Sequence, residues 1–273
     1  MALRQHTYAM QRLYRRLNRR KYVPGDPLEF LYGYDDPADR EIVALLASSL
    51  AYGRVRQILK SVSAVLERLG PRPARYLAKA SPSRLRRALS GFRHRFNSGG
   101  HVAAMLIGAR RLIGRFGSLE ACFGEGAGPT DQTVWPALQS FVDKITEAAD
   151  GECGHLLPDP ARRSACKRLN LMLRWLVRRD DVDPGGWSCV GPERLIVPLD
   201  THMHKIALAL GITRRKTADI RTALEVTAAF RQISPDDPVR YDFALTRLGI
   251  RDDMDFSAFF DGCRAPAKEK ACA

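Results

Sequence analysis

The run Leu195–Gly211, LIVPLDTHMHKIALALG, carries the clearest structural signal in the sequence. Apolar residues flank Pro198, which lacks the backbone N–H that a helix needs and therefore prevents an earlier helix start. Asp200 then stands at the N-cap position of a helix predicted over 201–210, which Gly211 ends. Capping alone would explain this aspartate. A carboxylate fixed at a helix mouth among apolar residues is also well placed to act on a proton or a cationic centre.

A second helix is predicted over 164–179, which begins SACKRLNLMLRWLVR. Its apolar residues recur at helical spacing and predict a buried stripe: Leu169, Met172, Leu173, Leu176 and Val177. Trp175 is also assigned to the core. The opposite side of the helix carries Lys167, Asn170, Arg174 and Arg178, and we expect the head group of Lys167 to point toward a cleft or solvent. Lys167 thus lies in the first turn, 33 positions before Asp200.

Similar periodicity predicts helices over most of the chain. Asp36 and Pro37 provide a cap and a first-turn proline for a helix that ends near Gly53, and another helix runs from there to Gly70. Further helical patterns cover 83–90, 101–116, 133–149, 216–232 and 238–248. The glycine-rich stretch 124–130 has neither a preceding strand nor a phosphate-loop lysine, so we interpret it as a flexible loop. The predicted fold class is all-α.

The charge of the chain points to an anionic partner. With 44 Lys+Arg against 30 Asp+Glu, the formal net charge is +14, which a polyanion would neutralise. Seven cations and no acid lie within residues 1–25, and seven cations without an acid lie within 160–179. A solvated helix face would alternate its signs, so we interpret these blocks as contacts to nucleic-acid phosphates. The candidate phosphate ligands are Arg15, Arg16, Arg19, Arg20, Arg163, Arg168 and Arg174.

The sequence also excludes several classes of protein. No run of about eighteen apolar residues exists, so we expect no membrane span and a cytoplasmic location. The cysteines contain no Cys-x-x-Cys pair, which argues against zinc and iron–sulfur sites. They are Cys122, Cys153, Cys166, Cys189, Cys263 and Cys272. We expect reduced, mostly structural thiols and no cofactor or metal.

The segment Val197–Ile206 resembles the V-D-T-H-hydrophobic-x-R signature of the helix-hairpin-helix DNA glycosylase superfamily. This resemblance implies a two-lobed all-α fold with the active site in the interlobe cleft and a catalytic aspartate at Asp200. In bifunctional members, an upstream lysine forms a Schiff base with the sugar. The spacing from Lys167 to Asp200 is similar to that of the archaeal 8-oxoguanine glycosylase branch. The implied lobes are 36–194 and 1–35 plus 195–273.

Two further segments extend the resemblance. The helix pair over 36–69 is similar to the superfamily's early helices, whose turn begins the base-extrusion apparatus. The run Gly91–Phe96 is similar to a G-h-R-x-R-a element of enzymes that act on oxidised purines. The superfamily's standard hairpin motif is absent, and Thr246 stands where archaeal members carry a tryptophan one turn after an aspartate, here Asp242.

Four motifs are similar to those of a bacterial family of unknown function, DUF2400. They are SACKRLN at 164–170, LRW at 173–175, PLDTH at 198–202 and DPVRYDFAL at 237–245. This resemblance covers nearly the whole chain, and it implies no activity by itself.

Together the resemblances imply a base-excision repair enzyme, a monomer associated with the nucleoid, whose partner is damaged duplex or single-stranded DNA. Neutral Lys167 would attack the sugar, Asp200 would stabilise positive charge there, and elimination would nick the strand. An oxidised purine such as 8-oxoguanine is the implied substrate. Flipping the nucleotide needs a wedge and a base pocket. The wedge candidates are Tyr52 and Arg54, and the pocket candidates are Phe92, Trp187, Asp242 and Phe243.

Two other functions stay open from sequence. A metal-dependent hydrolase would use Asp200, His202 and His204, although residues two apart on a helix do not face one another. Alternatively, the same fold binds DNA or senses damage without catalysis, which the basic blocks would serve equally well. Metal content tests the first alternative, and base release from damaged DNA tests the second.

Overall fold

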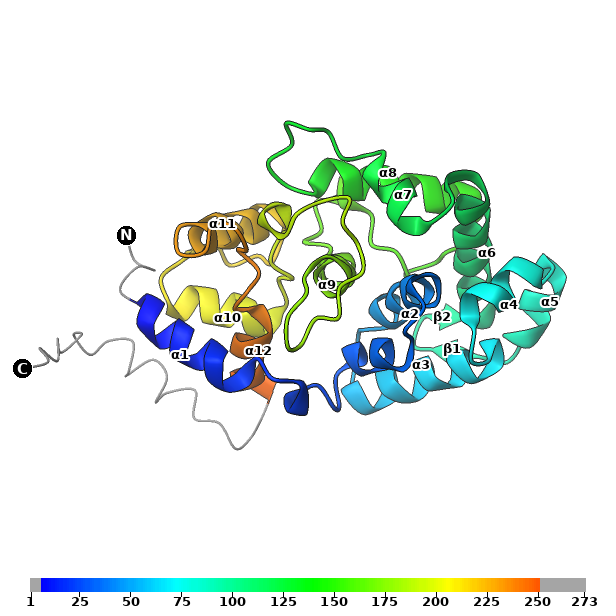
Figure 1. The fold of residues 1–273 in the computed structure, drawn as a ribbon, viewed down its shortest axis with the longest axis horizontal. Coiled ribbons are helices and arrows are strands. Elements are labelled where there is room, and N and C mark those ends of the chain that lie inside the picture. Colours follow the sequence, from blue (N-terminus) through cyan, green and yellow to red (C-terminus); the bar gives the residue numbers. More distant parts are fainter. Residues whose placement is uncertain (1–5, 251–273) are drawn as a thin grey trace, which may run out of the picture.

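The computed structural model describes residues 6–250, and over this range the chain is mostly helical (Figure 1). The α-helices are α1 (Thr7–Leu17), α2 (Pro37–Ser49), α3 (Val55–Leu69), α4 (Pro73–Lys79), α5 (Pro82–Ala88), α6 (Gly99–Phe116), α7 (Leu119–Gly124), α8 (Trp135–Ala148), α9 (Lys167–Val177), α10 (Thr201–Ala209), α11 (Ile220–Arg231) and α12 (Asp242–Ile250). Short 3-10 helices are η2 (Arg20–Tyr22), η3 (Pro27–Gly33), η4 (Pro160–Arg162) and η5 (Pro192–Arg194). Strands β1 (Arg93–His94) and β2 (Asn97–Ser98) pair as an antiparallel hairpin, with Arg93 opposite Ser98. The predicted helical class is confirmed.

Each predicted helix is present, with ends that differ by a few residues. Side-chain caps explain several of the starts, because Asp36, Ser98 and Asp219 accept hydrogen bonds from backbone N–H groups of the first turns. The sequence patterns above do not predict α1, α4 and α7. Helices α4 and α7 span only seven and six residues, too few to show a periodic stripe.

Helix α9 lies at the centre of the molecule, and Figure 1 views it nearly end-on. It packs against α2, and all of its residues from Met172 to Val177 are buried. The predicted apolar stripe is therefore confirmed, as is the burial of Trp175. The three polar residues that share the other side with Lys167 are buried as well: Asn170, Arg174 and Arg178.

Carboxylates that follow α9 in the chain surround its buried arginines. Arg178 pairs with Asp180 at 2.8 Å, with Asp237 at 3.0 Å and with Asp183. Arg174 shares Asp183 with it, at 3.1 Å. Burial opposes the charge on Arg178, but these carboxylates outweigh that effect and raise its pKa above the ordinary value. Part of a run of cations that contains no acid thus belongs to a buried ion network instead of a basic surface.

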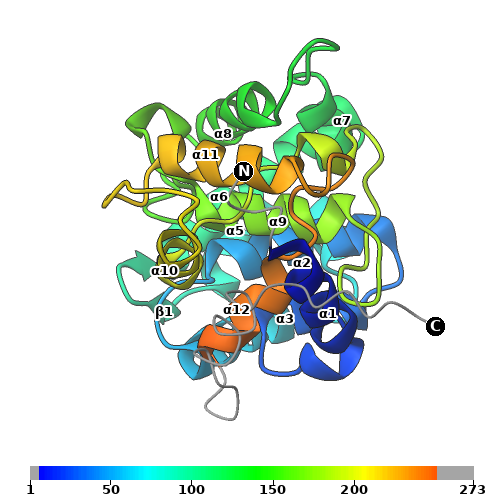
Figure 2. The same ribbon diagram turned by 90° about the vertical axis from the view of Figure 1, so that its left-hand side faces the viewer.

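The two ends of the described chain meet. Helix α1 packs along α12, and the two lie side by side in Figure 2. The rings of Tyr14 and Tyr241 meet edge-on with 6.0 Å between their centroids, and the Tyr14 hydroxyl donates a hydrogen bond to Asp180. The basic N-terminal block therefore includes a packed helix. The division into lobes of 36–194 and 1–35 plus 195–273 stays a prediction.

The four cysteines of the described chain are buried or partly buried. Cys122, Cys153, Cys166 and Cys189 are free. Burial raises the pKa of Cys153, Cys166 and Cys189 to about 11 each, which makes them poor nucleophiles. Cys263 and Cys272 lie outside the described residues.

Between residues 6 and 250, no helix combines the length and apolar character that a membrane crossing requires.

Candidate active site

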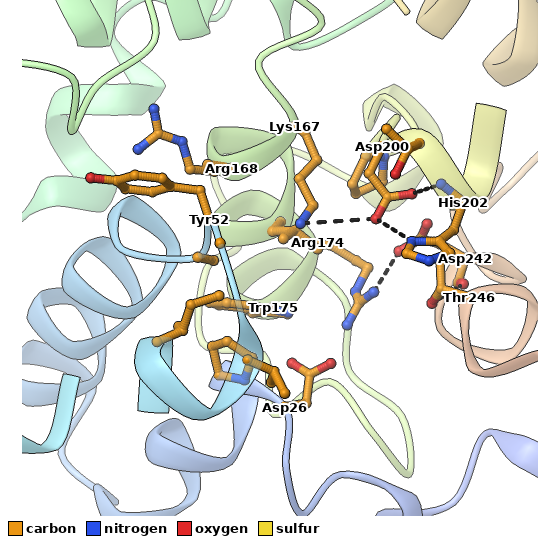
Figure 3. A pocket seen from close by; sticks show the side chains of 18 of the residues that line it. Asp26, Tyr52, Lys167, Arg168, Arg174, Trp175, Asp200, His202, Asp242 and Thr246 are labelled. Atoms are coloured by element: carbon orange, nitrogen blue, oxygen red, sulfur yellow. Dashed lines mark hydrogen bonds and ion pairs between the residues drawn. The ribbon is translucent and has the colours of Figure 1, made fainter. Parts of the chain in front are cut away.

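A pocket of about 770 Å³ brings the two predicted catalytic residues together (Figure 3). Lys167 at the start of α9 and Asp200 at the start of α10 face each other across it, with 4.0 Å between Nζ and Oδ2. Their side chains are 32% and 23% exposed, so both are partly desolvated yet accessible. At this distance, a small movement of either side chain on ligand binding would bring the ammonium group and the carboxylate into direct contact.

The capping role of Asp200 uses only one of its carboxylate oxygens. Oδ1 accepts hydrogen bonds from the backbone N–H groups of His202 at 2.9 Å and Met203 at 2.8 Å, which confirms the predicted N-cap. Oδ2 is turned to the pocket, where Lys167 lies at 4.0 Å and the His202 ring Nδ1 at 3.8 Å. The second oxygen is therefore left in position for chemistry.

Lys167 is placed by a bent loop. Cys166 before it has a φ of 45° and Arg163 a φ of 59°, conformations that cost a non-glycine residue free energy and are held by surrounding contacts. One such contact is the hydrogen bond from the Ile220 N–H to the Arg163 carbonyl at 3.2 Å. The Asn170 side chain donates to the Ala165 carbonyl at 3.0 Å. The loop therefore fixes where α9 begins and where the lysine side chain enters the pocket.

Charged side chains from three parts of the chain form another wall. Arg174 Nη1 binds Asp242 Oδ2 at 2.5 Å, and Arg247 of α12 pairs with Asp26. Burial raises the pKa of Asp242 to about 6, although Arg174 opposes this shift. Asp242 therefore lies in the pocket, as predicted. The assignment of Arg174 to phosphate contact is wrong, because its guanidinium is buried and paired with carboxylates.

Tyr52 forms the opposite wall and is held in place. Its hydroxyl donates to the His94 carbonyl at 3.1 Å and accepts from the Asn97 amide. The Arg168 guanidinium lies 4.8 Å from the centre of its ring. That guanidinium donates to the carbonyls of Ser49, Leu156 and His155. These bonds use part of its hydrogen-bonding capacity within the protein, and Arg168 also lines the pocket. Its phosphate role stays a prediction.

Four of the base-pocket and wedge candidates do not line this pocket. Phe92 is buried in the core. Trp187 is also buried, where its indole N–H donates to Glu41 at 2.8 Å. Phe243 is buried and is not among the residues that line the pocket. The guanidinium carbon of Arg247 lies 4.5 Å from the centre of its ring. The assignment of these aromatic residues to the pocket surface is therefore wrong. Arg54 is exposed at the start of α3 and also lies outside the pocket lining.

The basic residues predicted to bind phosphate have different environments. Arg15, Arg16 and Arg163 are exposed. Arg19 is paired with Asp181 at 2.5 Å, with both side chains more than half exposed. The guanidinium of Arg20 lies 3.6 Å from the centre of the Tyr32 ring. These five side chains are accessible to a polyanion, and their role stays a prediction.

The metal-ligand alternative is not supported by the geometry. His204 is turned away from Asp200, and its Nε2 lies 2.8 Å from the carbonyl oxygen of Arg215. In the part of the chain that the structure describes, no group of three or more His, Cys, Asp or Glu side chains is arranged to hold a metal ion. The hydrolase hypothesis therefore lacks its ligand set.

Sequence reasoning missed several pocket residues. Asp26, Trp175, Thr246 and Arg247 all line the cavity, and they come from the N-cap of η3, from α9 and from α12. The DPVRYDFAL motif contains Asp242 and was the one sequence signal that α12 contributes to the site. No local sequence pattern predicts that Asp26 and Trp175 line a cavity, because the cavity forms only where segments distant in sequence pack together.

Comparison with curated proteins and with solved structures finds no match. A family model described as "Protein of unknown function (DUF2400)" matches residues 26–251. The matched range contains the pocket-lining residues of α9, α10 and α12. The chain belongs to this DUF2400 family.

Proposed function

We propose that the protein is a DNA glycosylase with strand-nicking lyase activity, in which Lys167 is the nucleophile and Asp200 the catalytic carboxylate. The observation that carries the proposal is the 4.0 Å approach of Lys167 Nζ to Asp200 Oδ2 inside a pocket. The resemblance of both segments to the helix-hairpin-helix glycosylases supports it, as does the net charge of +14. The proposed substrate is a damaged base in DNA, with an oxidised purine such as 8-oxoguanine as the first choice.

The proposed reaction uses both groups. Neutral Lys167 attacks the sugar C1′ with its lone pair, and the bond from C1′ to the base breaks with its electrons leaving on the base, which takes up a proton. Asp200 Oδ2 stabilises the positive charge that develops at C1′ and accepts a proton from the attached amine. Opening of the sugar gives an imine. Loss of a C2′ proton then expels the 3′ phosphate, and water frees the lysine.

The hairpin beside the pocket supports contact with unstacked DNA. Phe96 at its tip is 69% exposed, and the Arg95 guanidinium lies 5.7 Å from its ring centre. The same guanidinium lies 6.0 Å from the ring centre of Tyr52, which lines the pocket. A Cβ placed on Gly53 would fall 2.9 Å from Arg95 Nη1, so this glycine permits the close approach. An exposed aromatic ring next to a cation suits base stacking and phosphate binding.

The test is base release from a panel of duplexes and single strands, each with one lesion. Wild type is compared with Lys167→Ala, Asp200→Asn and the control Lys205→Ala, which removes an exposed lysine of α10. We expect release of at least one damaged base by wild type and the control, and none by the other two variants. Salt-dependent binding without release of any base would favour a non-catalytic DNA-binding module instead.

A further inference from the structure

Three buried polar atoms of the pocket wall make no hydrogen bond within the described residues. They are Trp175 Nε1, Asp242 Oδ1 and Arg247 Nε. Asp242 and Arg247 each have a partner through another atom of the same group. Trp175 has only one polar side-chain atom, and the residue is 0% exposed. An unmade hydrogen bond at a buried donor is unfavourable, so this N–H points to a ligand.

Another buried tryptophan of the described chain provides a comparison. Trp187 is also buried, and its Nε1 donates to Glu41 Oε1 at 2.8 Å. Buried indole N–H groups ordinarily find such a partner. Figure 3 shows Trp175 across the pocket from Asp200, on the side of Asp26. Both oxygens of Asp26 already accept other bonds, from Leu28 N and from Arg247.

We infer that Trp175 is a specificity-determining residue whose Nε1–H donates to a carbonyl oxygen or ring nitrogen of the base held in the pocket. This inference rests on the proposed function. Asp242 Oδ1 supplies the complementary acceptor for an N–H of the same ring. The pocket thereby selects a heterocycle that carries both an acceptor and an N–H group, and it disfavours an apolar ring of the same shape, which would leave both protein atoms unpaired.

The test separates recognition of the base from chemistry at the sugar. Two replacements of Trp175 are used: phenylalanine, and benzothienylalanine, in which sulfur replaces the N–H with little change of shape. Trp187→Phe is the matched control. Base release from the best lesion strand is measured under single-turnover conditions. Cleavage of a strand with a preformed abasic site, which has no base to contact Trp175, is measured alongside.

We expect base release to fall by about 10-fold in both Trp175 variants, while cleavage at the abasic site changes by less than about 2-fold. The control should leave the ratio of the two activities at the wild-type value. An unchanged ratio in the benzothienylalanine variant would overturn the inference, because shape is kept and only the donor is lost.

Failure of the proposed function is recognised separately, as a wild-type protein that neither cleaves nor forms an adduct at the abasic site. In that case the affinity for a strand containing 8-oxoguanine is compared with that for a strand containing tetrahydrofuran at the same position. A preference that weakens by about 10-fold in the Trp175 variants supports the inference. No preference in wild type, or the same preference in the variants, overturns it.

Discussion

The two ends of α9 use the same kind of residue in opposite ways. At its start, Lys167 is 32% exposed and has one carboxylate, Asp200, at 4.0 Å. At its end, Arg178 is 3% exposed and has three carboxylates around it. Both residues belong to the stretch 160–179, which has seven cations and no acid. The fold brings three carboxylates to Arg178, which therefore stabilises the core. It brings one carboxylate to Lys167, which lines a pocket.

The largest expected effect is on stability at the buried end. Arg178→Met should lower the free energy of unfolding by about 3–5 kcal/mol, because it leaves buried carboxylates without their partner. Urea unfolding followed by circular dichroism measures this change. The exposed neighbour provides the control, and Arg179→Met should shift the free energy by less than about 0.5 kcal/mol. Equal small shifts in both variants would contradict the contrast between the two ends.

The next effect concerns pH and Asp242. Burial raises the pKa of this carboxyl from 3.8 to about 6, so the folded protein holds a proton that the unfolded chain has released between these values. The contribution of Asp242 to stability is therefore most favourable below about pH 4, and it falls as pH rises to about 6, by up to about 3 kcal/mol. The difference in unfolding free energy between wild type and Asp242→Asn should show this slope. A difference that is flat between pH 4 and pH 6 would contradict it.

A smaller effect is expected at the rim. Phe96→Ala should weaken binding to single-stranded or damaged DNA by about 10-fold, which corresponds to the loss of one base stack. Tyr8→Ala removes another exposed aromatic side chain, on α1, and should leave the affinity unchanged. Fluorescence anisotropy at fixed salt measures both. An equal loss in the two variants would mean that the hairpin tip has no special part in binding.

The smallest effect separates the two oxygens of Asp200. Asparagine keeps an N-cap acceptor and alanine does not, so Asp200→Ala should lower the free energy of unfolding by about 1 kcal/mol more than Asp200→Asn. Both variants should lose base release. An asparagine variant that retained base release would show that capping is the only role of this residue.

Local patterns predicted most of the helices and the N-cap at Asp200, since both depend on neighbours in sequence. They also placed Lys167 and Asp200 at two helix starts, which the fold brings together. They could not predict the burial of Arg174, because Asp242 is 68 positions away. Nor could they distinguish Phe92, which is 7% exposed, from Phe96, which is 69% exposed. Phe92 precedes the hairpin and Phe96 lies in its turn, and strands of two residues each are too short to show a pattern.

The most direct test of the central claim is the site of covalent capture. Wild-type protein is incubated with a strand carrying an abasic site in the presence of borohydride, digested, and the modified peptide is identified by mass spectrometry. The account predicts one adduct, on Lys167, that disappears in Lys167→Ala and persists in Lys205→Ala. Absence of an adduct in wild type, or an adduct on another residue that survives Lys167→Ala, would contradict it.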